Sequence, residues 1–152
     1  MVTVMATGTF DILHMGHIYF LKEAKKLGDS LIVVVACDKT VRRLKHEPVT
    51  PEQMRLNLIK ELQMVDKAVL GREDDMFAVV EEHKPDIIAL GYDQIHDEKS
   101  LRRKIKDRNL SAQIVRLPKY DQTSDLDGTR RIIAKIIEAY GFQRQMEELE
   151  SK

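Results

Sequence analysis

Two histidines and two glycines lie close together near the N-terminus, directly after an apolar run. The run covers residues 2–6, the chain turns at Gly8, and His14 and His17 flank Gly16, where an apolar-periodic segment begins. A buried strand, a loop and a helix start form the geometry in which open α/β sheets hold phosphates. Glycine tolerates a positive φ and the close approach of a ligand, so we expect one of these at Gly8. The pattern predicts that two imidazoles and several free N–H groups face one small volume.

The spacing of the two histidines argues against a zinc site. Zinc proteases place histidines at positions i and i+4 of a helix, with a glutamate base between them. Here His14 and His17 are three residues apart across a glycine, and no third ligand is near them in the sequence. A lone histidine is usually a surface or satisfied residue, and a lone Gly-Thr is usually a tight turn. The strand, glycines and histidines together favour a functional site, and no metal-ligating residue is identified.

These residues carry a resemblance to a known family. Thr7–Asp11, followed by the His-Met-Gly-His of residues 14–17, resembles the paired signature of the cytidylyltransferase-like nucleotidyltransferases. Such enzymes join a nucleoside monophosphate to an acceptor phosphate or carboxylate and release pyrophosphate. The resemblance implies that His14 and His17 are catalytic, and that a divalent ion such as Mg²⁺ accompanies the nucleotide. It also implies a homodimer. The implied nucleotide-binding residues are Thr9, Phe10, His14, Met15, Gly16, His17, Asp93 and Tyr120.

Two further stretches narrow the resemblance within the family. Residues 36–41 and 86–94 look closer to the archaeal FAD synthase branch, which transfers AMP from ATP to FMN. The alternative is the glycerol-3-phosphate cytidylyltransferase branch with CTP as donor, which typically has a second acidic residue where Tyr92 stands. Archaeal synthases often carry cysteines in the final loop, and this chain has none there. A non-catalytic nucleotide-binding module is the third alternative, although a module that only binds does not need both histidines.

Three residues are weaker candidates for phosphate contacts, each implied by the family's pattern. Lys45 lies in the basic stretch 39–48, which is either a cationic lid or a solvated loop. Arg55 matches a family arginine that points toward the phosphates, or else it is an exposed helix residue. Thr129 matches one hydroxyl residue of a Ser/Thr cluster, but Arg130 replaces the next one. The acidic residues nearby, Asp125 and Asp127, weaken this third assignment.

Apolar runs alternate with amphipathic segments along the chain. Strands are predicted at residues 2–6, 31–36, 65–70, 87–90 and 113–117. Buried strands separated by helices indicate right-handed βαβ units. The predicted fold is a Rossmann-like open five-stranded parallel sheet, order 3-2-1-4-5, with helices on both faces. The Gly-x-Gly-x-x-Gly fingerprint of dinucleotide-binding domains is absent. The sequence therefore lacks the main feature that would indicate an enzyme transferring hydride with a dinucleotide.

The helix that follows residue 50 has the most detailed prediction. Thr50 is expected to cap it, with Pro51 in the first turn and Gln53 completing a capping box. The apolar residues expected to line its buried side are Met54, Leu58, Leu62 and Val65. Further helices are predicted from Ile18 to Leu27, from Asp75 to His83 with Phe77, Val80 and Met76 inward, after Asp97, and from Thr129.

Composition limits the remaining function classes. The 152 residues predict one nucleotidyltransferase domain at 1–140 and a helical or frayed tail at 141–152. Lysine plus arginine (25) balance aspartate plus glutamate (25), so no bulk field favours nucleic acid or an anionic membrane. The single cysteine, Cys37, is expected to be a packed residue in a reducing compartment, and a cytoplasmic location is expected.

Overall fold

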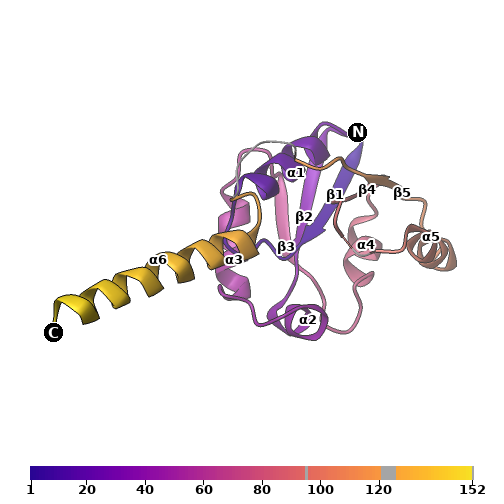
Figure 1. Cartoon of the computed structure of the whole chain (residues 1–152). Helices are drawn as coiled ribbons and strands as arrows, with labels where there is room; N and C mark the ends of the chain where they lie inside the picture. The colour runs from indigo at the N-terminus through magenta and orange to yellow at the C-terminus, as the bar shows by residue number, and fades with distance from the viewer. Residues whose placement is uncertain (95, 121–125, 152) are drawn as a thin grey trace.

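A computed structural model of the chain describes residues 1–94, 96–120 and 126–151. Its centre is a five-stranded parallel sheet in the order β3-β2-β1-β4-β5 (Figure 1). This confirms the predicted fold class and strand order. In chain order, the elements are β1 (Thr3–Gly8), α1 (Met15–Lys25), β2 (Ser30–Val35), α2 (Asp38–Leu44), α3 (Glu52–Lys60), β3 (Lys67–Leu70), α4 (Ala78–His83), β4 (Ile87–Leu90), α5 (Glu98–Asp107), β5 (Gln113–Arg116) and α6 (Thr129–Glu150).

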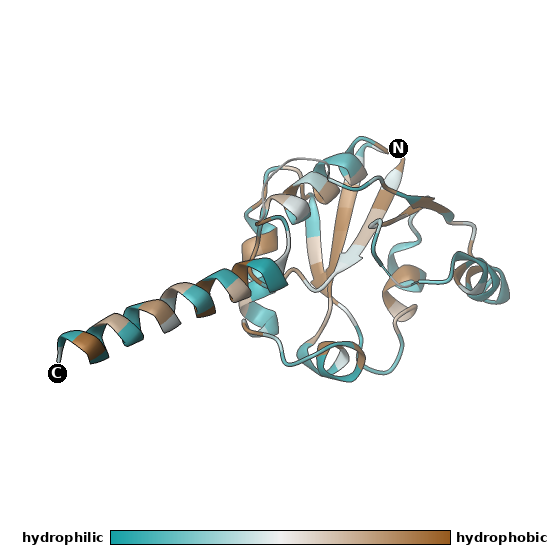
Figure 2. Ribbon diagram, viewed as in Figure 1, coloured by the Kyte–Doolittle hydropathy of each residue, from teal (hydrophilic) through white to brown (hydrophobic). Residues whose placement is uncertain are grey.

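The strands are buried on both faces because helices cover each side of the sheet. Alternate side chains of a strand point to opposite faces, so Val4 and Met5 of β1 belong to different apolar clusters. One cluster joins the sheet to α1 and α3, and the other joins it to α4 and α5. Figure 2 shows the apolar interior as the brown strands between these helices. The strand termini at Gly8, Val35 and Leu90 therefore share one edge of the sheet.

The basic stretch 39–48 after β2 is mostly helical. This corrects the expectation that it is a loop, whether a cationic lid or a solvated loop. α2 covers Asp38–Leu44, with Asp38 in its first turn and Arg42 and Arg43 in its last. This charge order suits the helix dipole. Cys37 is a packed residue, as expected, and its Sγ lies 3.1 Å from Thr40 Oγ1. Only the end of the stretch, from Lys45 onward, leaves the helix.

The predicted start of α3 is wrong, and its predicted inward side is only partly right, because Leu62 and Val65 pack against the core but Met54 and Leu58 do not. Pro51 occupies the N-cap position without a side-chain cap, and Thr50 bonds Asp11 instead of capping the helix. The buried residues are Arg55, Leu56 and Ile59. Met54 and Leu58 are 49% and 40% exposed, so the helix is rotated relative to the face that an apolar count selects. A count of apolar residues assigns an arginine to the surface, but Arg55 is part of the buried face of α3.

Other elements match their predictions with shifted bounds. β3 starts at Lys67 rather than at residue 65, and α4 starts at Ala78 rather than at residue 75. Phe77 and Val80 are buried as expected, whereas Met76 is 46% exposed. Asp97 caps α5 by accepting a hydrogen bond from the Lys99 N–H, as predicted.

The last helix, α6, leaves the body of the molecule. It starts at Thr129, as predicted, and projects away from the sheet and its helices (Figure 1). The helix passes residue 140 and continues to Glu150 without interruption, so the expected boundary at residue 140 falls inside one helix. Across Thr129–Glu150 no residue is buried.

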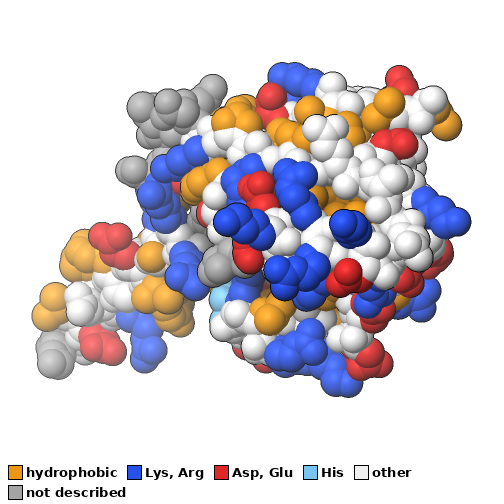
Figure 3. All heavy atoms as spheres, turned by 90° about the vertical axis from the view of Figure 1, so that its right-hand side faces the viewer, with side chains coloured by type: hydrophobic (Ala, Val, Ile, Leu, Met, Phe, Trp, Pro, Cys, Tyr) orange, Lys and Arg blue, Asp and Glu red, His pale blue; other side chains and the backbone are white. Residues whose placement is uncertain are grey.

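The surface carries both signs of charge. On the face seen in Figure 3, Lys and Arg side chains are interspersed with Asp and Glu side chains, in keeping with the formal net charge of zero. Among the described residues, no helix combines the length and the apolar character needed to cross a membrane.

Candidate active site

His14 and His17 stack on each other at the start of α1, where the loop after β1 ends. His14 is the N-cap residue in extended conformation, and its Nδ1 accepts a hydrogen bond from the Gly16 N–H at 3.1 Å. The two imidazole centroids are 3.7 Å apart, with 25° between the ring planes. Because Nδ1 of His14 is an acceptor, its proton in the neutral ring is on Nε2. The cap therefore selects the tautomer in which Nε2–H is free to donate.

Burial keeps both imidazoles neutral. Desolvation is the main cause that lowers the pKa of His17 to about 3, and repulsion from Lys45 and from the protonated form of His14 adds to it. Desolvation also lowers the pKa of His14, although the carboxylates of Asp127 and Asp93 oppose this shift. Among the described residues, Nδ1 of His17 is buried without a hydrogen-bond partner. A buried polar atom left in this way points to a ligand that completes it.

The loop between β1 and α1 is shaped by Phe10 rather than by a left-handed glycine. Phe10 and Ile12 have positive φ values of 55° and 51°, while Gly8 does not. A Cβ at Gly8 would lie 2.8 Å from the Phe10 ring, which is buried and meets His17 edge-on at a centroid distance of 5.4 Å. The expectation of a positive φ at Gly8 is therefore wrong. Gly8 makes room for Phe10, and Phe10 supports His17.

Asp11 ties two distant segments to this loop, residues 49–50 and the start of α6. Its carboxylate accepts hydrogen bonds from the N–H groups of Val49 and Thr50 and from the Thr50 hydroxyl. Burial raises the pKa of Asp11, but the hydrogen bonds from Thr50 and Val49 outweigh it and hold that pKa below its ordinary value. Its carbonyl accepts from the Thr129 hydroxyl at 2.6 Å. The sequence did not single out Asp11 as an organising residue, although it lies within the recognised motif.

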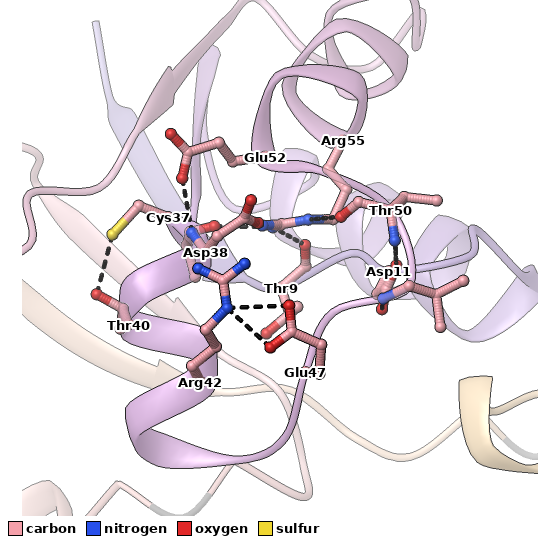
Figure 4. A network of polar contacts seen from close by, with 12 residues as sticks. Thr9, Asp11, Cys37, Asp38, Thr40, Arg42, Glu47, Thr50, Glu52 and Arg55 are labelled. Atoms are coloured by element: carbon pink, nitrogen blue, oxygen red, sulfur yellow. Dashed lines mark hydrogen bonds and ion pairs between the residues drawn. The ribbon is translucent and has the colours of Figure 1, made fainter.

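Arg55 is fully buried and acts as an internal clamp, which corrects its expected direction toward the phosphates (Figure 4). Its guanidinium donates to the carbonyls of Thr9, Ala36 and Thr50 at 2.7 to 3.0 Å. It also forms an ion pair with Asp38. These contacts join the β1 loop, the end of β2 and the start of α3. Arg55 thus fixes the loop that carries Thr9 and Phe10 from behind.

Lys45 lies at the C-terminal cap of α2 and faces the same loop. Its Nζ is 3.4 Å from Thr9 Oγ1. Its charge also lowers the pKa values of His17 and His96. Lys45 therefore places an ammonium group beside the loop that carries Thr9, and its contact with a phosphate stays a prediction.

The turn after β4 meets the end of β1 from the other side. The Gln94 side chain donates to the Thr7 carbonyl at 2.7 Å and accepts from the Gly91 N–H at 3.2 Å. Asp93 is exposed, and its charge acts on the pKa of His14. Tyr92 is 50% exposed, with Lys119 Nζ 5.7 Å from its ring centroid. The predicted residue Asp93 is thus near the histidine pair.

Arg116 at the end of β5 holds this turn, and the sequence analysis missed it. Its guanidinium donates to the carbonyls of Gly91, Gln94 and His96 at 2.8 to 3.1 Å, and it pairs with Glu98. An arginine at the carboxyl end of an edge strand is the only sequence signal for this role. The predicted strand order places the end of residues 113–117 beside residues 91–96, but the hydrogen bonds of Arg116 to that turn are seen only in the structure.

The remaining predicted site residues lie around the start of α1. A Cβ at Gly16 would be 2.6 Å from the Asp127 carbonyl, so the segment before α6 rests on the helix start. The Tyr120 ring contacts the Tyr19 ring at a centroid distance of 5.1 Å. Met15 is 51% exposed. Asp125 lies outside the described residues. In the described part of the chain, no group of three or more His, Cys, Asp or Glu side chains could hold a metal ion.

Known proteins with similar sequences belong to the nucleotidyltransferase family that the motif of residues 7–17 resembles. The family model described as "Cytidylyltransferase-like" matches residues 5–135. A curated FAD synthase of Aciduliprofundum boonei is 56% identical over 138 residues, covering 91% of this chain and 92% of the relative. An FAD synthase of Archaeoglobus fulgidus is 51% identical over 137 residues, covering 90% and 98%.

A solved structure supports the fold at similar identity. The crystal structure of a protein named for lipopolysaccharide core biosynthesis, from Thermoplasma volcanium, is 57% identical, with a TM-score of 0.78. The matched region covers 79% of this chain and 98% of the Thermoplasma volcanium chain. A pantoate-beta-alanine ligase from Francisella tularensis, at 18% identity and a TM-score of 0.57, shares the fold alone. With the paired histidines placed at the carboxyl edge of a 3-2-1-4-5 sheet, this chain belongs to the cytidylyltransferase-like family.

Proposed function

We propose that this protein is an FAD synthase, which transfers AMP from ATP to FMN and releases pyrophosphate. The observation that carries the proposal is the identity of 51–56% to curated archaeal FAD synthases over nine-tenths of the chain. The stacked His14–His17 pair gives this proposal its chemistry.

In this reaction a phosphate oxygen of FMN attacks the α-phosphorus of ATP. The new P–O bond forms as the bond to the bridging oxygen breaks, and pyrophosphate leaves with that electron pair. The acceptor phosphate is already anionic, so no general base is needed. Catalysis then depends on positioning and on stabilising the charge that develops on the phosphoryl oxygens.

The histidines suit that task as neutral donors. The His14 Nε2–H is free because Nδ1 is held by the Gly16 N–H. Nδ1 of His17 has no partner among the described residues, and a substrate phosphate would supply one. Lys45 would add positive charge near Thr9, and the start of α1 adds aligned N–H groups. A divalent ion such as Mg²⁺ would arrive with ATP as part of the substrate, bound mainly by phosphate oxygens and water.

The other contacts keep this arrangement in place. Asp11, Arg55 and Arg116 are positioning residues for the β1 loop and for the turn that carries Tyr92 and Asp93. We further propose that the nucleotide lies across residues 7–17 with Asp93 and Tyr120 on its far side. A cytoplasmic homodimer that does not bind nucleic acid completes the proposal.

One assay tests the substrates. The protein is incubated with Mg²⁺, with either ATP or CTP, and with either FMN or glycerol 3-phosphate, and pyrophosphate is followed in all four combinations. We expect release only with ATP plus FMN. Release only with CTP plus glycerol 3-phosphate would replace this proposal by the cytidylyltransferase activity. A protein that binds ATP and releases no pyrophosphate from any pair would instead be a nucleotide-binding module or use another acceptor.

A further inference from the structure

The two central strands of the sheet, β1 and β4, stop pairing before either strand ends. Their register ends at the pair Ala6–Ala89, although β1 continues to Gly8 and β4 to Leu90. The order of the sheet also changes direction between them, since β2 and β3 lie beyond β1 whereas β5 lies beyond β4. In open α/β sheets, ligands bind outside the carboxyl ends of the strands at such a point. The groups that link the two strand ends therefore lie at the candidate site.

The Gln94 side chain links the two strand ends. Its Nε2 donates to the Thr7 carbonyl of β1 at 2.7 Å, and its Oε1 accepts a hydrogen bond from the Gly91 N–H, directly after β4, at 3.2 Å. An amide can do both because it carries a donor and an acceptor on one planar group. Gln94 therefore continues the connection between β1 and β4 beyond their last pair.

The backbone of this turn, residues 91–94, is fixed separately by Arg116 of β5. The Arg116 guanidinium donates to the Gly91 carbonyl at 2.8 Å and to the Gln94 carbonyl at 3.1 Å. The Gln94 N–H also donates to the Gly91 carbonyl at 3.3 Å. Gln94 is thus held through its backbone by β5 and through its side chain by β1. The turn cannot move relative to β1 without loss of these hydrogen bonds.

Asp93 is carried by this fixed turn. A Cβ at Gly91 would lie 3.5 Å from Asp93 Oδ1 and 3.5 Å from Gln94 Cγ, so both side chains fold back over the end of β4. The Asp93 carboxylate lies on the same side of the turn as Gln94, and its position depends on the contacts that hold the turn.

The charge of Asp93 acts on His14. Desolvation lowers the pKa of His14, and the carboxylates of Asp127 and Asp93 oppose this shift. Asp127 acts from the segment before α6, and Asp93 acts from the turn after β4. The neutral His17 ring stacks on His14 within α1. Asp93 is therefore the contribution of the β4 turn to the electrostatics of the histidine pair.

We propose that Gln94 is a positioning residue, which holds Asp93 at a fixed place beside His14. The proposal rests on the proposed function, in which His14 donates a hydrogen bond to a substrate phosphate. A carboxylate held at this place offsets the positive charge that builds up on the imidazole as it donates. A carboxylate that is free to move loses this effect and can repel the phosphates instead. Electrostatic stabilisation of this kind depends on groups that are fixed before the reaction.

Nuclear magnetic resonance titration of His14 in the substrate-free protein tests the positioning. Asp93→Asn should lower the pKa of His14, because it removes a negative charge that raises it. Gln94→Met removes both hydrogen bonds of the amide at a similar side-chain length. In the Gln94→Met background, the change caused by Asp93→Asn should shrink to about half or less, because the carboxylate is no longer held. Gln113→Met changes an exposed glutamine on β5, is the matched control, and should leave the full change.

Two results would overturn the proposal. One is an Asp93→Asn variant that leaves the pKa of His14 unchanged, and the other is an equally large change in the Gln94→Met background. Gln94→Asn has an amide that is one methylene shorter and does not reach Thr7. It gives the same comparison if Gln94→Met does not fold.

Steady-state rates with ATP, FMN and Mg²⁺ provide a second readout. Gln94→Met should lower kcat by about 3- to 30-fold, a smaller loss than removal of a histidine donor, with little change in the KM for ATP. A role in stability alone would lower the unfolding midpoint and leave kcat of the folded enzyme unchanged, and this result would also overturn the proposal. The titration needs no substrate, so a wild-type protein that releases no pyrophosphate overturns the proposed function and not the positioning of Asp93.

Discussion

At the scale of single residues, the proposed mechanism depends on imidazoles that would donate hydrogen bonds while uncharged. His14 is held in one tautomer by the Gly16 N–H, and His17 is desolvated between Phe10 and His14. The hydrogen bond from a neutral donor strengthens most where negative charge develops on the acceptor during the reaction. In the ground state this hydrogen bond contributes less to binding, because a lysine such as Lys45 already attracts the phosphates.

Removing one donor should therefore affect turnover more than binding. We expect His17→Ala to lower kcat for pyrophosphate release by about 10²- to 10³-fold, as for the loss of one transition-state donor, with a much smaller change in ATP affinity. His46→Ala, an exposed histidine, is the matched control and should keep wild-type kinetics. Steady-state rates combined with calorimetric ATP binding measure both quantities. Equal losses in binding and turnover would refute the transition-state role.

The lowered pKa of His17 also predicts how stability depends on pH. The unfolded chain takes up a proton at His17 below its ordinary pKa of 6.5, whereas the folded protein does so only near 3. The unfolded state therefore binds more protons in this window, and the free energy of unfolding falls as the pH falls. Above this window the contribution is constant. His14 and His96 shift in the same direction.

His17→Phe should remove one part of this dependence. Urea unfolding at about pH 5 and about pH 8 gives the difference in free energy for each variant, with at most about 1.4 kcal/mol per pH unit from a single histidine. We expect a smaller difference for His17→Phe than for the wild type. An equal or larger difference in His17→Phe would mean that His17 is already protonated in the folded protein.

At the scale of elements, the site loop is held from behind by α3. The Arg55 guanidinium donates four hydrogen bonds. Their acceptors are the carbonyls of Thr9, Ala36 and Thr50 and the carboxylate of Asp38. A buried charge with this many partners stabilises one arrangement of the loop, and its removal leaves buried acceptors without donors.

We expect Arg55→Met to lower the free energy of unfolding by about 3–5 kcal/mol, because Asp38 and three carbonyls lose their donor together. Arg43→Met, an exposed change on α2, should have little effect. Chemical denaturation measures the difference. A stable Arg55→Met variant that loses only ATP affinity would restore the phosphate contact that the sequence suggested.

At the scale of the whole molecule, the fold supplies positions and hydrogen bonds rather than a metal site. Within residues 1–94, 96–120 and 126–151, no three ligating side chains come together. We expect the divalent ion of the proposed reaction to be bound mainly by the phosphate oxygens of the nucleotide and by water.

Removal of the metal should separate activity from stability. We expect excess EDTA to abolish pyrophosphate release from ATP and FMN and to leave the thermal unfolding midpoint of the free protein unchanged. Adding back Mg²⁺ should restore the rate. A midpoint that falls with EDTA would show a structural metal site that the described residues do not provide.

The sequence by itself determined the order of strands and helices and the position of the histidine pair. Both depend on local patterns: continuous apolar runs for strands such as residues 87–90, and a short motif for His14 and His17. The role of Asp97 as a helix cap could also be predicted from a local pattern, because the residue that it contacts is only two positions away.

Only the tertiary structure decided the contacts of Asp11, Arg55 and Arg116. The carbonyls that Arg55 binds lie 5, 19 and 46 residues away, and Arg116 reaches a turn 20 to 25 residues away. A periodicity count treats a buried arginine as polar surface, and it therefore selected a face of α3 that is only partly buried. The apolar side chains of α6, such as Ile137, are exposed in the structure, although a count of apolar residues would assign them to a buried face. Burial depends on what packs against a helix, and that is a property of the whole fold.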